Sequence, residues 1–181
     1  YSSKRVIEAE NRIFGHINNG QNTGQLIDKE AYLKIIKEQD YNLTKGQKEA
    51  SIHIATSKDK IIGIQGDAGV GKTTMLLQLN KALSEKAEFI GLAPTGKAAS
   101  EIENVTGIKS QTVDSFLLKE NQYIQVEREL SKHENYKQKV YLVDEASMMD
   151  TFKIDKLLQK ATNENAKVVF IGDTKQLKAV G

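Results

Sequence analysis

The sequence predicts an α/β domain with a doubly wound, mainly parallel sheet, preceded by a small helical appendage. Three observations lead to this fold class: four short apolar runs without alternation, helical stretches that separate them, and a helical spacing of apolar residues before the first run. Strands of a parallel sheet are buried on both faces, so they are apolar at nearly every position. Regular alternation of such strands with helices predicts right-handed crossovers and helices on both faces of the sheet.

The beginning of the chain has the pattern of amphipathic helices. Residues 3–18 carry apolar side chains at helical spacing, and the cluster NNGQNTG at 18–24 predicts a turn. Asp28 can cap a second helix. We therefore assign residues 1–41 to a helical appendage and residues 42–181 to the α/β domain.

The elements of the α/β domain follow in alternation. The runs expected to be strands are IIGI (61–64), FIGLA (89–93), VYLV (140–143) and VVFI (168–171). Helices are expected over residues 44–57, 72–86, 95–105 and 152–162. The polar residues 119–138 show no strong period, so we expect a surface excursion there, with YIQV (123–126) as an additional short strand.

Directly after the first run, residues 66–73 have the spacing Gly-x-x-x-x-Gly-Lys-Thr, which is typical of a phosphate-binding loop. In such a loop, backbone N–H groups converge on phosphate oxygens at the N-terminus of a helix. Lys72 would reach the β- and γ-phosphates, and the Thr73 hydroxyl would ligate Mg²⁺. A chance glycine-rich turn is the alternative, but the strand before the motif and the helix after it favour the phosphate site. The residues predicted to bind nucleotide are Gly66, Asp67, Ala68, Gly69, Val70, Gly71, Lys72, Thr73 and Thr74.

An acidic pair follows the run VYLV. Asp144 would lie beside the phosphate-binding loop if the two strands are close in the sheet, and would hold the hydration shell of the Mg²⁺. Glu145 would orient or deprotonate an attacking water; an acidic cap on the next helix is the alternative. We find neither the acceptor site of a kinase nor the base-specific motif of a GTPase. The prediction is therefore nucleotide hydrolysis, with Lys72 and Glu145 as catalytic residues and Thr73 and Asp144 as Mg²⁺ ligands.

Composition excludes several classes of site. The 26 Lys and Arg residues nearly balance 24 Asp and Glu, so any basic surface must be local. The absence of cysteine excludes disulfides and thiolate metal sites and fits a cytoplasmic location. The three histidines are far apart, so no structural metal is expected. No apolar run approaches the ~20 residues of a membrane span, and a chain that starts at Tyr1 is expected to be a piece of a longer protein.

Three further segments, together with the two motifs above, carry a resemblance to a known family. They are LTKGQKEA (43–50), APTGKAAS (93–100) and VVFIGDTKQL (168–177). The order of the five motifs resembles the first motor domain of superfamily 1 DNA helicases of the RecD-like branch, most of all conjugative relaxase-helicases of the TraI and TraA type. The resemblance covers roughly residues 42–181. It implies a RecA-like P-loop NTPase fold, ATP and Mg²⁺ as cofactors, and single-stranded DNA and a second motor domain as partners.

The resemblance also implies roles for individual residues. Gln47 would recognise the adenine edge, and Gln176 would sense the γ-phosphate as a third catalytic residue. Pro94, Thr95 and Lys97 would contact the backbone of single-stranded DNA, where a lysine and a helix N-terminus suit phosphate.

These roles have simpler alternatives. Thr44 and Gln47 are also spaced as a capping box, in which the glutamine only closes the helix start. Gln176 and Lys97 could be solvated surface residues, and Thr95 could be the N-cap of the following helix.

The predicted function is that of an ATP-dependent motor domain, which couples ATP hydrolysis to movement along single-stranded DNA in a longer protein. A non-catalytic domain that binds single-stranded DNA and an unrelated P-loop ATPase are the alternatives. Helicase motors of this kind receive arginine fingers from a second domain, so we expect residues 1–181 alone to hydrolyse ATP slowly.

Overall fold

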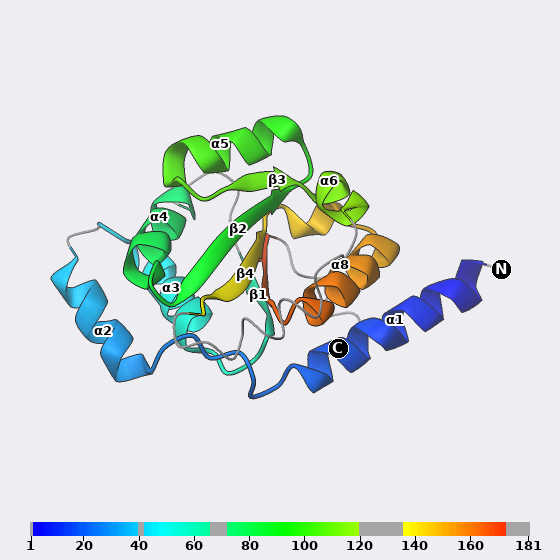
Figure 1. The fold of residues 1–181 in the computed structure, drawn as a ribbon, viewed down its shortest axis with the longest axis horizontal. Helices are drawn as coiled ribbons and strands as arrows, with labels where there is room; N and C mark the ends of the chain where they lie inside the picture. Colours follow the sequence, from blue (N-terminus) through cyan, green and yellow to red (C-terminus); the bar gives the residue numbers. More distant parts are fainter. Residues whose placement is uncertain (1, 40–41, 66–71, 120–135, 173–181) are drawn as a thin grey trace.

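In the computed structural model, which describes residues 2–39, 42–65, 72–119 and 136–172, parallel strands form one sheet (Figure 1). The strands are β1 (Ile61–Gln65), β2 (Ala87–Ala93), β3 (Ser110–Thr112), β4 (Gln138–Val143) and β5 (Lys167–Gly172). Their order across the sheet is β1-β5-β4-β2-β3, and every neighbouring pair is parallel. The carboxyl ends of all five strands therefore meet at one edge, called the carboxyl edge below, which is where open α/β sheets bind ligands.

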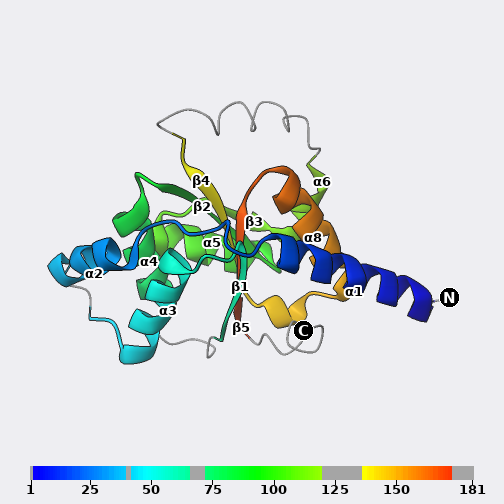
Figure 2. The same ribbon diagram turned by 90° about the horizontal axis from the view of Figure 1, so that it is seen from below.

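Helices cover both faces of this sheet (Figure 2). On one face lie α3 (Lys45–Thr56), α4 (Lys72–Leu83) and α5 (Gly96–Thr106), and on the other lie α6 (Val113–Leu118) and α8 (Thr151–Asn163). The predicted fold class, an α/β domain with a doubly wound parallel sheet, is confirmed.

The two helices predicted as an appendage lie on opposite faces of the sheet. α1 (Ser2–Asn19) packs along α8, where Ile13 joins the core and Arg12 donates to Asp155 at 2.9 Å. α2 (Lys29–Glu38) packs on α3, and its buried Tyr32 joins the core of the other face. Asp28 caps α2 as expected, accepting a hydrogen bond from the Glu30 N–H. The domain boundary at residue 41 stays a prediction.

The central strands have the burial expected of a parallel sheet, whereas β1 does not. In β4 and β5, the four apolar residues at 140–143 and the four at 168–171 are all at most 2% exposed. β1 alternates instead, with Gly63 and Gln65 exposed. The expectation that all four runs are buried on both faces is wrong for β1, because it has a strand neighbour on one side only in the described sheet.

β3 and α6 were not predicted from the sequence. β3 has three polar residues that, within the described part of the chain, pair only with β2. α6 has six residues and is capped by Thr112, which accepts the N–H of Ser115. β4 begins at Gln138, two residues before the predicted run. The predicted strand at 123–126 lies outside the described residues.

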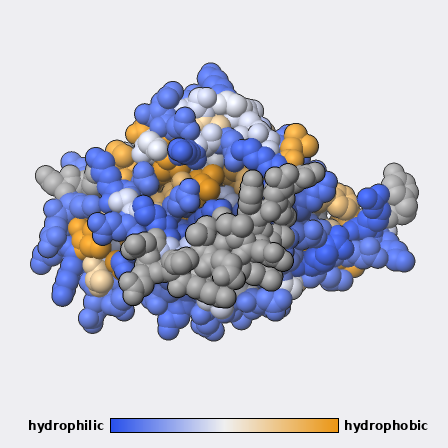
Figure 3. Space-filling model, viewed as in Figure 1, coloured by the Kyte–Doolittle hydropathy of each residue, from blue (hydrophilic) through white to orange (hydrophobic). Residues whose placement is uncertain are grey.

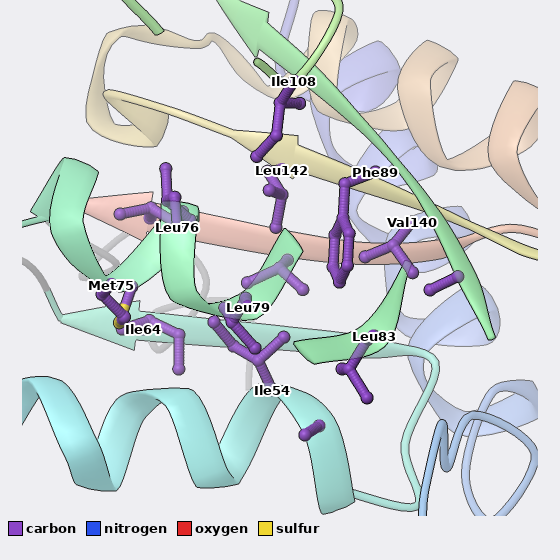
Figure 4. Packing of buried hydrophobic residues seen from close by; sticks show 14 of the residues in the cluster. Ile54, Ile64, Met75, Leu76, Leu79, Leu83, Phe89, Ile108, Val140 and Leu142 are labelled. Atoms are coloured by element: carbon purple, nitrogen blue, oxygen red, sulfur yellow. The ribbon is translucent and has the colours of Figure 1, made fainter. Parts of the chain in front are cut away.

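α4 contributes several apolar side chains to the larger core and packs against both the sheet and α3. Figure 4 shows Leu79 and Leu83 of α4 close to Ile54 of α3, with Phe89 and Val140 of the sheet on the other side. Exposed large apolar side chains lie on several elements, two of them on α1, and hydrophilic residues predominate around a central apolar area on the face seen in Figure 3. None of the helices in the described ranges combines the length and apolar character of a membrane span.

Lys167, the first residue of β5, is fully buried at the opposite, amino edge of the sheet. Its ammonium group donates to the carbonyl oxygens of Gly24 at 2.8 Å and Ser57 at 3.0 Å. Burial lowers the pKa of Lys167 to about 8, and the nearby Asp59 partly opposes this shift. Lys167 therefore anchors the C-terminus of α3 at the amino edge, so α3 itself begins at the carboxyl edge.

Candidate nucleotide site at the carboxyl edge

The predicted phosphate-binding motif lies where β1 ends and α4 begins. β1 ends at Gln65 and α4 begins at Lys72, directly after residues 66–71. The predicted nucleotide-binding residues Gly66, Asp67, Ala68, Gly69, Val70 and Gly71 lie outside the described residues, as does Gln176. The strand before the motif and the helix after it are both present, which is the context that a phosphate-binding loop requires.

Lys72 and Asp144 form an ion pair across the carboxyl edge. The Nζ of Lys72 lies 2.5 Å from Oδ1 of Asp144, and the two side chains are 22% and 12% exposed. β1 and β4 are not neighbours, since β5 lies between them. The pair therefore spans the end of β5, and the condition on which the prediction for Asp144 rested, closeness to the phosphate motif, is met.

The Asp144 carboxylate is oriented by a second donor. Its Oδ1 also accepts the backbone N–H of Glu145 at 2.9 Å, while the backbone N–H of Asp144 donates to Leu92 O at 2.8 Å. Oδ1 thus accepts from both Lys72 and the Glu145 N–H, and these two hydrogen bonds fix the orientation of the carboxylate. An oriented carboxylate beside a lysine is what a site for a metal-bound phosphate requires.

Oxygen donors at this position fit Mg²⁺. Thr73 is the second residue of α4 and is half-buried, with Thr74 directly after it, and Asp144 supplies the carboxylate. Mg²⁺ is typically held by one or two such protein oxygens together with substrate phosphates and water. The described residues contain no group of three or more His, Cys, Asp or Glu side chains that could hold a metal ion.

Glu145 has a strained backbone and an exposed side chain. Its φ and ψ are 51° and 48°, in the left-handed region, which costs a non-glycine residue roughly 1 kcal/mol or more. It precedes the 3-10 helix η1 (Ala146–Met148), so it is not the side-chain cap that the alternative proposed: no side-chain capping bond is made there. The neighbouring Gly172, at the end of β5, has a φ of 120° that favours glycine. The chain thus turns sharply after β4 and presents Glu145 to solvent beside Asp144.

Gln47 lies in a capping box at the start of α3. Its Oε1 accepts the backbone N–H of Thr44 at 2.9 Å, and Thr44 Oγ1 accepts the N–H of Gln47 at 3.2 Å. The simpler of the two predicted roles is therefore present in the structure. Since α3 begins at the carboxyl edge, the position of Gln47 is compatible with recognition of a base as well, and that role stays a prediction.

The predicted DNA-contact segment follows β2 at the same edge. Thr95 is the N-cap of α5, accepting the Ala98 N–H at 3.2 Å, which is the simpler role foreseen for it. Lys97 is exposed in the first turn of that helix, and Pro94 is half-buried before it. An exposed lysine in the first turn of a helix favours contact with a phosphate group.

A small cavity of about 40 Å³ joins the two predicted regions. Its lining includes Pro94, Asp144, Glu145 and, from η1, Met148. Lys153 and Asp114 also line it and pair with each other at 3.0 Å. Sequence reasoning did not single out Lys153, and the pairing of Asp114 with Lys153 could not be predicted because it joins α6 to α8 through tertiary packing.

Comparison with known proteins shows the family of the chain. The model of a family described as AAA domain matches residues 42–181, which include every motif discussed above. The chain belongs to this AAA domain family, within its RecD-like superfamily 1 helicase branch. The resemblance inferred from the motifs is confirmed.

Relatives of this AAA domain include conjugation proteins and helicases. The chain is 30% identical to the multifunctional conjugation protein TraI of Escherichia coli K12, over 98% of this chain and 10% of that protein. It is 32% identical to the conjugal transfer protein TraA of Rhizobium radiobacter, over 76% of this chain and 12% of the relative. The ATP-dependent RecD2 DNA helicase of Deinococcus radiodurans is also 32% identical, over 74% of this chain and 18% of that helicase. The chain thus spans only about a tenth of the length of the conjugation proteins it matches.

Proposed function

We propose that this AAA domain is the ATP-binding first motor domain of a DNA helicase, and that in a longer protein it couples ATP hydrolysis to movement along single-stranded DNA. The contact between Lys72 and Asp144 supports the proposal most strongly. It brings a cation from the phosphate motif to an acidic residue at the end of a central strand, at the edge where α/β sheets bind ligands.

In this proposal, Lys72 and the N-terminus of α4 hold the β- and γ-phosphates of ATP. Thr73 and Asp144 hold Mg²⁺, which neutralises charge that develops on the phosphates. Glu145, exposed beside Asp144, orients the attacking water. Gln176 is proposed to sense the γ-phosphate.

Charge around the γ-phosphate also determines the rate of hydrolysis. An arginine finger contributes about 10³–10⁵ to this class of reaction. We propose that the arginine comes from a second motor domain of the longer protein, so the chain alone turns ATP over slowly.

DNA is proposed to bind along the start of α5. Lys97 is exposed there, four residues after the end of β2. Pro94, between β2 and Lys97, lines the same cavity as Glu145, so the proposed DNA contact lies close to the proposed nucleotide site. The names of the relatives support a role in conjugative DNA transfer, and the lack of cysteine supports a cytoplasmic location.

Binding of a fluorescent single-stranded oligonucleotide, followed by anisotropy with and without Mg²⁺ and ATP, tests this proposal. Coupling is reciprocal, so a motor domain must change its DNA affinity when nucleotide binds. Lys97→Ala should weaken DNA binding and reduce its dependence on salt by about one phosphate contact. Lys109→Ala, at an exposed lysine just before β3, is the control and should change neither the DNA affinity nor its salt dependence. Binding that is indifferent to ATP would instead favour the non-catalytic DNA-binding alternative.

A further inference from the structure

Three polar side chains, one each from α2, α3 and α4, meet in the interior. Tyr32 of α2 and Ser51 of α3 are 0% exposed, and Gln78 of α4 is 1% exposed. Polar groups at this depth destabilise the fold unless they are hydrogen-bonded. Their arrangement is therefore constrained, and every one of the three has partners.

The hydrogen bonds between these residues run in one direction. Ser51 Oγ donates to Gln78 Oε1 at 2.7 Å. Because a hydroxyl has one proton, Ser51 accepts from the Tyr32 hydroxyl, which lies 2.5 Å away and also 3.2 Å from Gln78 Oε1. At the other end, Gln78 Nε2 donates to Gln39 Oε1 at 3.2 Å. Burial raises the pKa of Tyr32, which keeps the phenol in its donor form.

Ser51 and Gln78 each lie one to two helical turns after a predicted nucleotide-binding residue on the same helix. Ser51 follows Gln47 by four residues on α3, which places both on the same face of the helix. Gln78 follows Thr73 by five residues on α4. α3 and α4 both begin at the carboxyl edge and run side by side (Figure 4). The relative position of Ser51 and Gln78 therefore determines how far Gln47 stands from Lys72 and Thr73.

Apolar contacts alone do not fix the position of α3 along α4. Ile54 packs close to Leu79 and Leu83, but such contacts are non-directional. A slide of one residue along the helix axis moves the groups by about 1.5 Å, which breaks the Ser51–Gln78 hydrogen bond while apolar burial persists. Buried polar networks can specify a unique packing in this way.

We infer that Tyr32, Ser51 and Gln78 are positioning residues that hold α3 in register with α4, and so set the preference of the site for adenine over guanine. This inference rests on the proposed function, in which Gln47 recognises the base and Lys72 the phosphates. α2 contains none of the predicted site residues, but through Tyr32 it would contribute to the choice between ATP and GTP.

The test is a calorimetric comparison of three probes, each with Mg²⁺: ATP, GTP and tripolyphosphate, which lacks a base. The main variant is Tyr32→Phe/Ser51→Ala/Gln78→Met, which removes the network without leaving one member unsatisfied. We expect the ratio of ATP affinity to GTP affinity to fall about five- to tenfold, the loss that accompanies one misplaced hydrogen bond, while tripolyphosphate affinity stays at the wild-type value.

Two further variants separate positioning from general weakening of the fold. Ser51→Ala, a smaller change, should lower the same ratio if the triple variant does not fold. Leu79→Val, at a fully buried apolar position on the same helix, should lower the melting temperature and leave the ratio unchanged.

The possible failures are distinguishable. An unchanged ratio in folded Ser51→Ala and in the folded triple variant overturns the inference, as does an equal loss in Leu79→Val. If wild-type protein binds neither ATP nor tripolyphosphate, the proposed function itself fails. If wild-type protein binds ATP and GTP equally, the site has no base preference to position, and the inference also fails.

Discussion

Lys72 at the start of α4 and Asp144 directly after β4 are joined by a contact of 2.5 Å, although β5 lies between β4 and β1, the strand that leads into α4. The two motifs that carry them are far apart in sequence, so only the folded sheet brings them together. The contact places a cation and an oriented carboxylate at the point where β1 leads into α4. Predictions about the nucleotide site follow from this geometry.

Asp144→Asn should weaken ATP binding only when Mg²⁺ is present. The amide retains the size of the side chain but is a poor Mg²⁺ ligand, and it no longer pairs with Lys72 as an anion. With EDTA in place of Mg²⁺, ATP affinity should not fall, because Lys72 keeps its charge for the phosphates. Equilibrium dialysis under both conditions measures the difference, and an equal loss in Mg²⁺ and in EDTA would show that Asp144 does not act through the metal.

Gln47→Ala should affect both stability and base preference. The capping box is present, so its loss should lower the free energy of unfolding by about 0.5–2 kcal/mol. If Gln47 also recognises adenine, ATP affinity should fall much more than GTP affinity. Thr44→Ala is the matched control, since it removes the other half of the box. Loss of stability in both variants, with no change of the ATP-to-GTP ratio in either, would leave Gln47 with a capping role only.

Glu145→Gly should not destabilise the fold, although glycine usually does. At an ordinary helical position glycine costs about 0.5–1 kcal/mol relative to alanine. At Glu145, relief of the left-handed backbone offsets this cost, so the free energy of unfolding should equal or exceed the wild-type value. Urea denaturation compares this variant with Lys156→Gly, at an exposed position inside α8. Equal losses in the two variants would mean that Glu145 carries no backbone strain.

Lys167 should make stability rise with pH in the alkaline range. Its pKa is about 8 in the folded protein and about 10.4 when unfolded. Between these values the unfolded chain binds more protons, so the free energy of unfolding increases with pH. The stability that Lys167 contributes above pH 10.4 is lost progressively as the pH falls from 10.4 to 8.

The difference in free energy of unfolding between wild type and Lys167→Met isolates this contribution, since other titrating groups are common to both proteins. We expect the difference to shift in favour of wild type by about 2 kcal/mol between pH 8 and pH 10. A constant difference would show that Lys167 keeps its ordinary pKa. Lys167→Met also removes the hydrogen bonds to Gly24 and Ser57, but it does so at every pH, because a neutral amine still has two N–H donors.

The parts of the fold that could be predicted are those with a strong local pattern. Unbroken apolar runs marked β4 and β5, and helical spacing marked the buried face of α1, where Ala9 and Ile13 are at most 1% exposed. β3 could not be found, because three polar residues at a sheet edge carry no periodic signal. The separation of α1 and α2 onto opposite faces is likewise a property of tertiary packing and not of either helix.

The candidate site could be predicted only where its residues belong to motifs. Lys72, Thr73, Asp144 and Glu145 were found in this way, and the sequence also allowed the capping role of Thr95 and the capping box of Gln47. The strained backbone of Glu145 was not predicted, since it depends on how the chain turns past Gly172. The network of Tyr32, Ser51 and Gln78 was missed because its members are ordinary polar residues on three separate helices.

Titration calorimetry of Mg²⁺ and ATP against the wild-type chain and Lys72→Ala tests the central claim most directly. Lys156→Ala, an exposed lysine of α8 on the other face of the sheet, is the control. We predict that the wild-type chain and the control bind ATP equally and that Lys72→Ala binds about one to two decades more weakly, since a charge-assisted contact contributes roughly 1.5–3 kcal/mol. Equal affinity of Lys72→Ala and wild type, or no binding by wild type, would contradict an ATP site at the carboxyl edge.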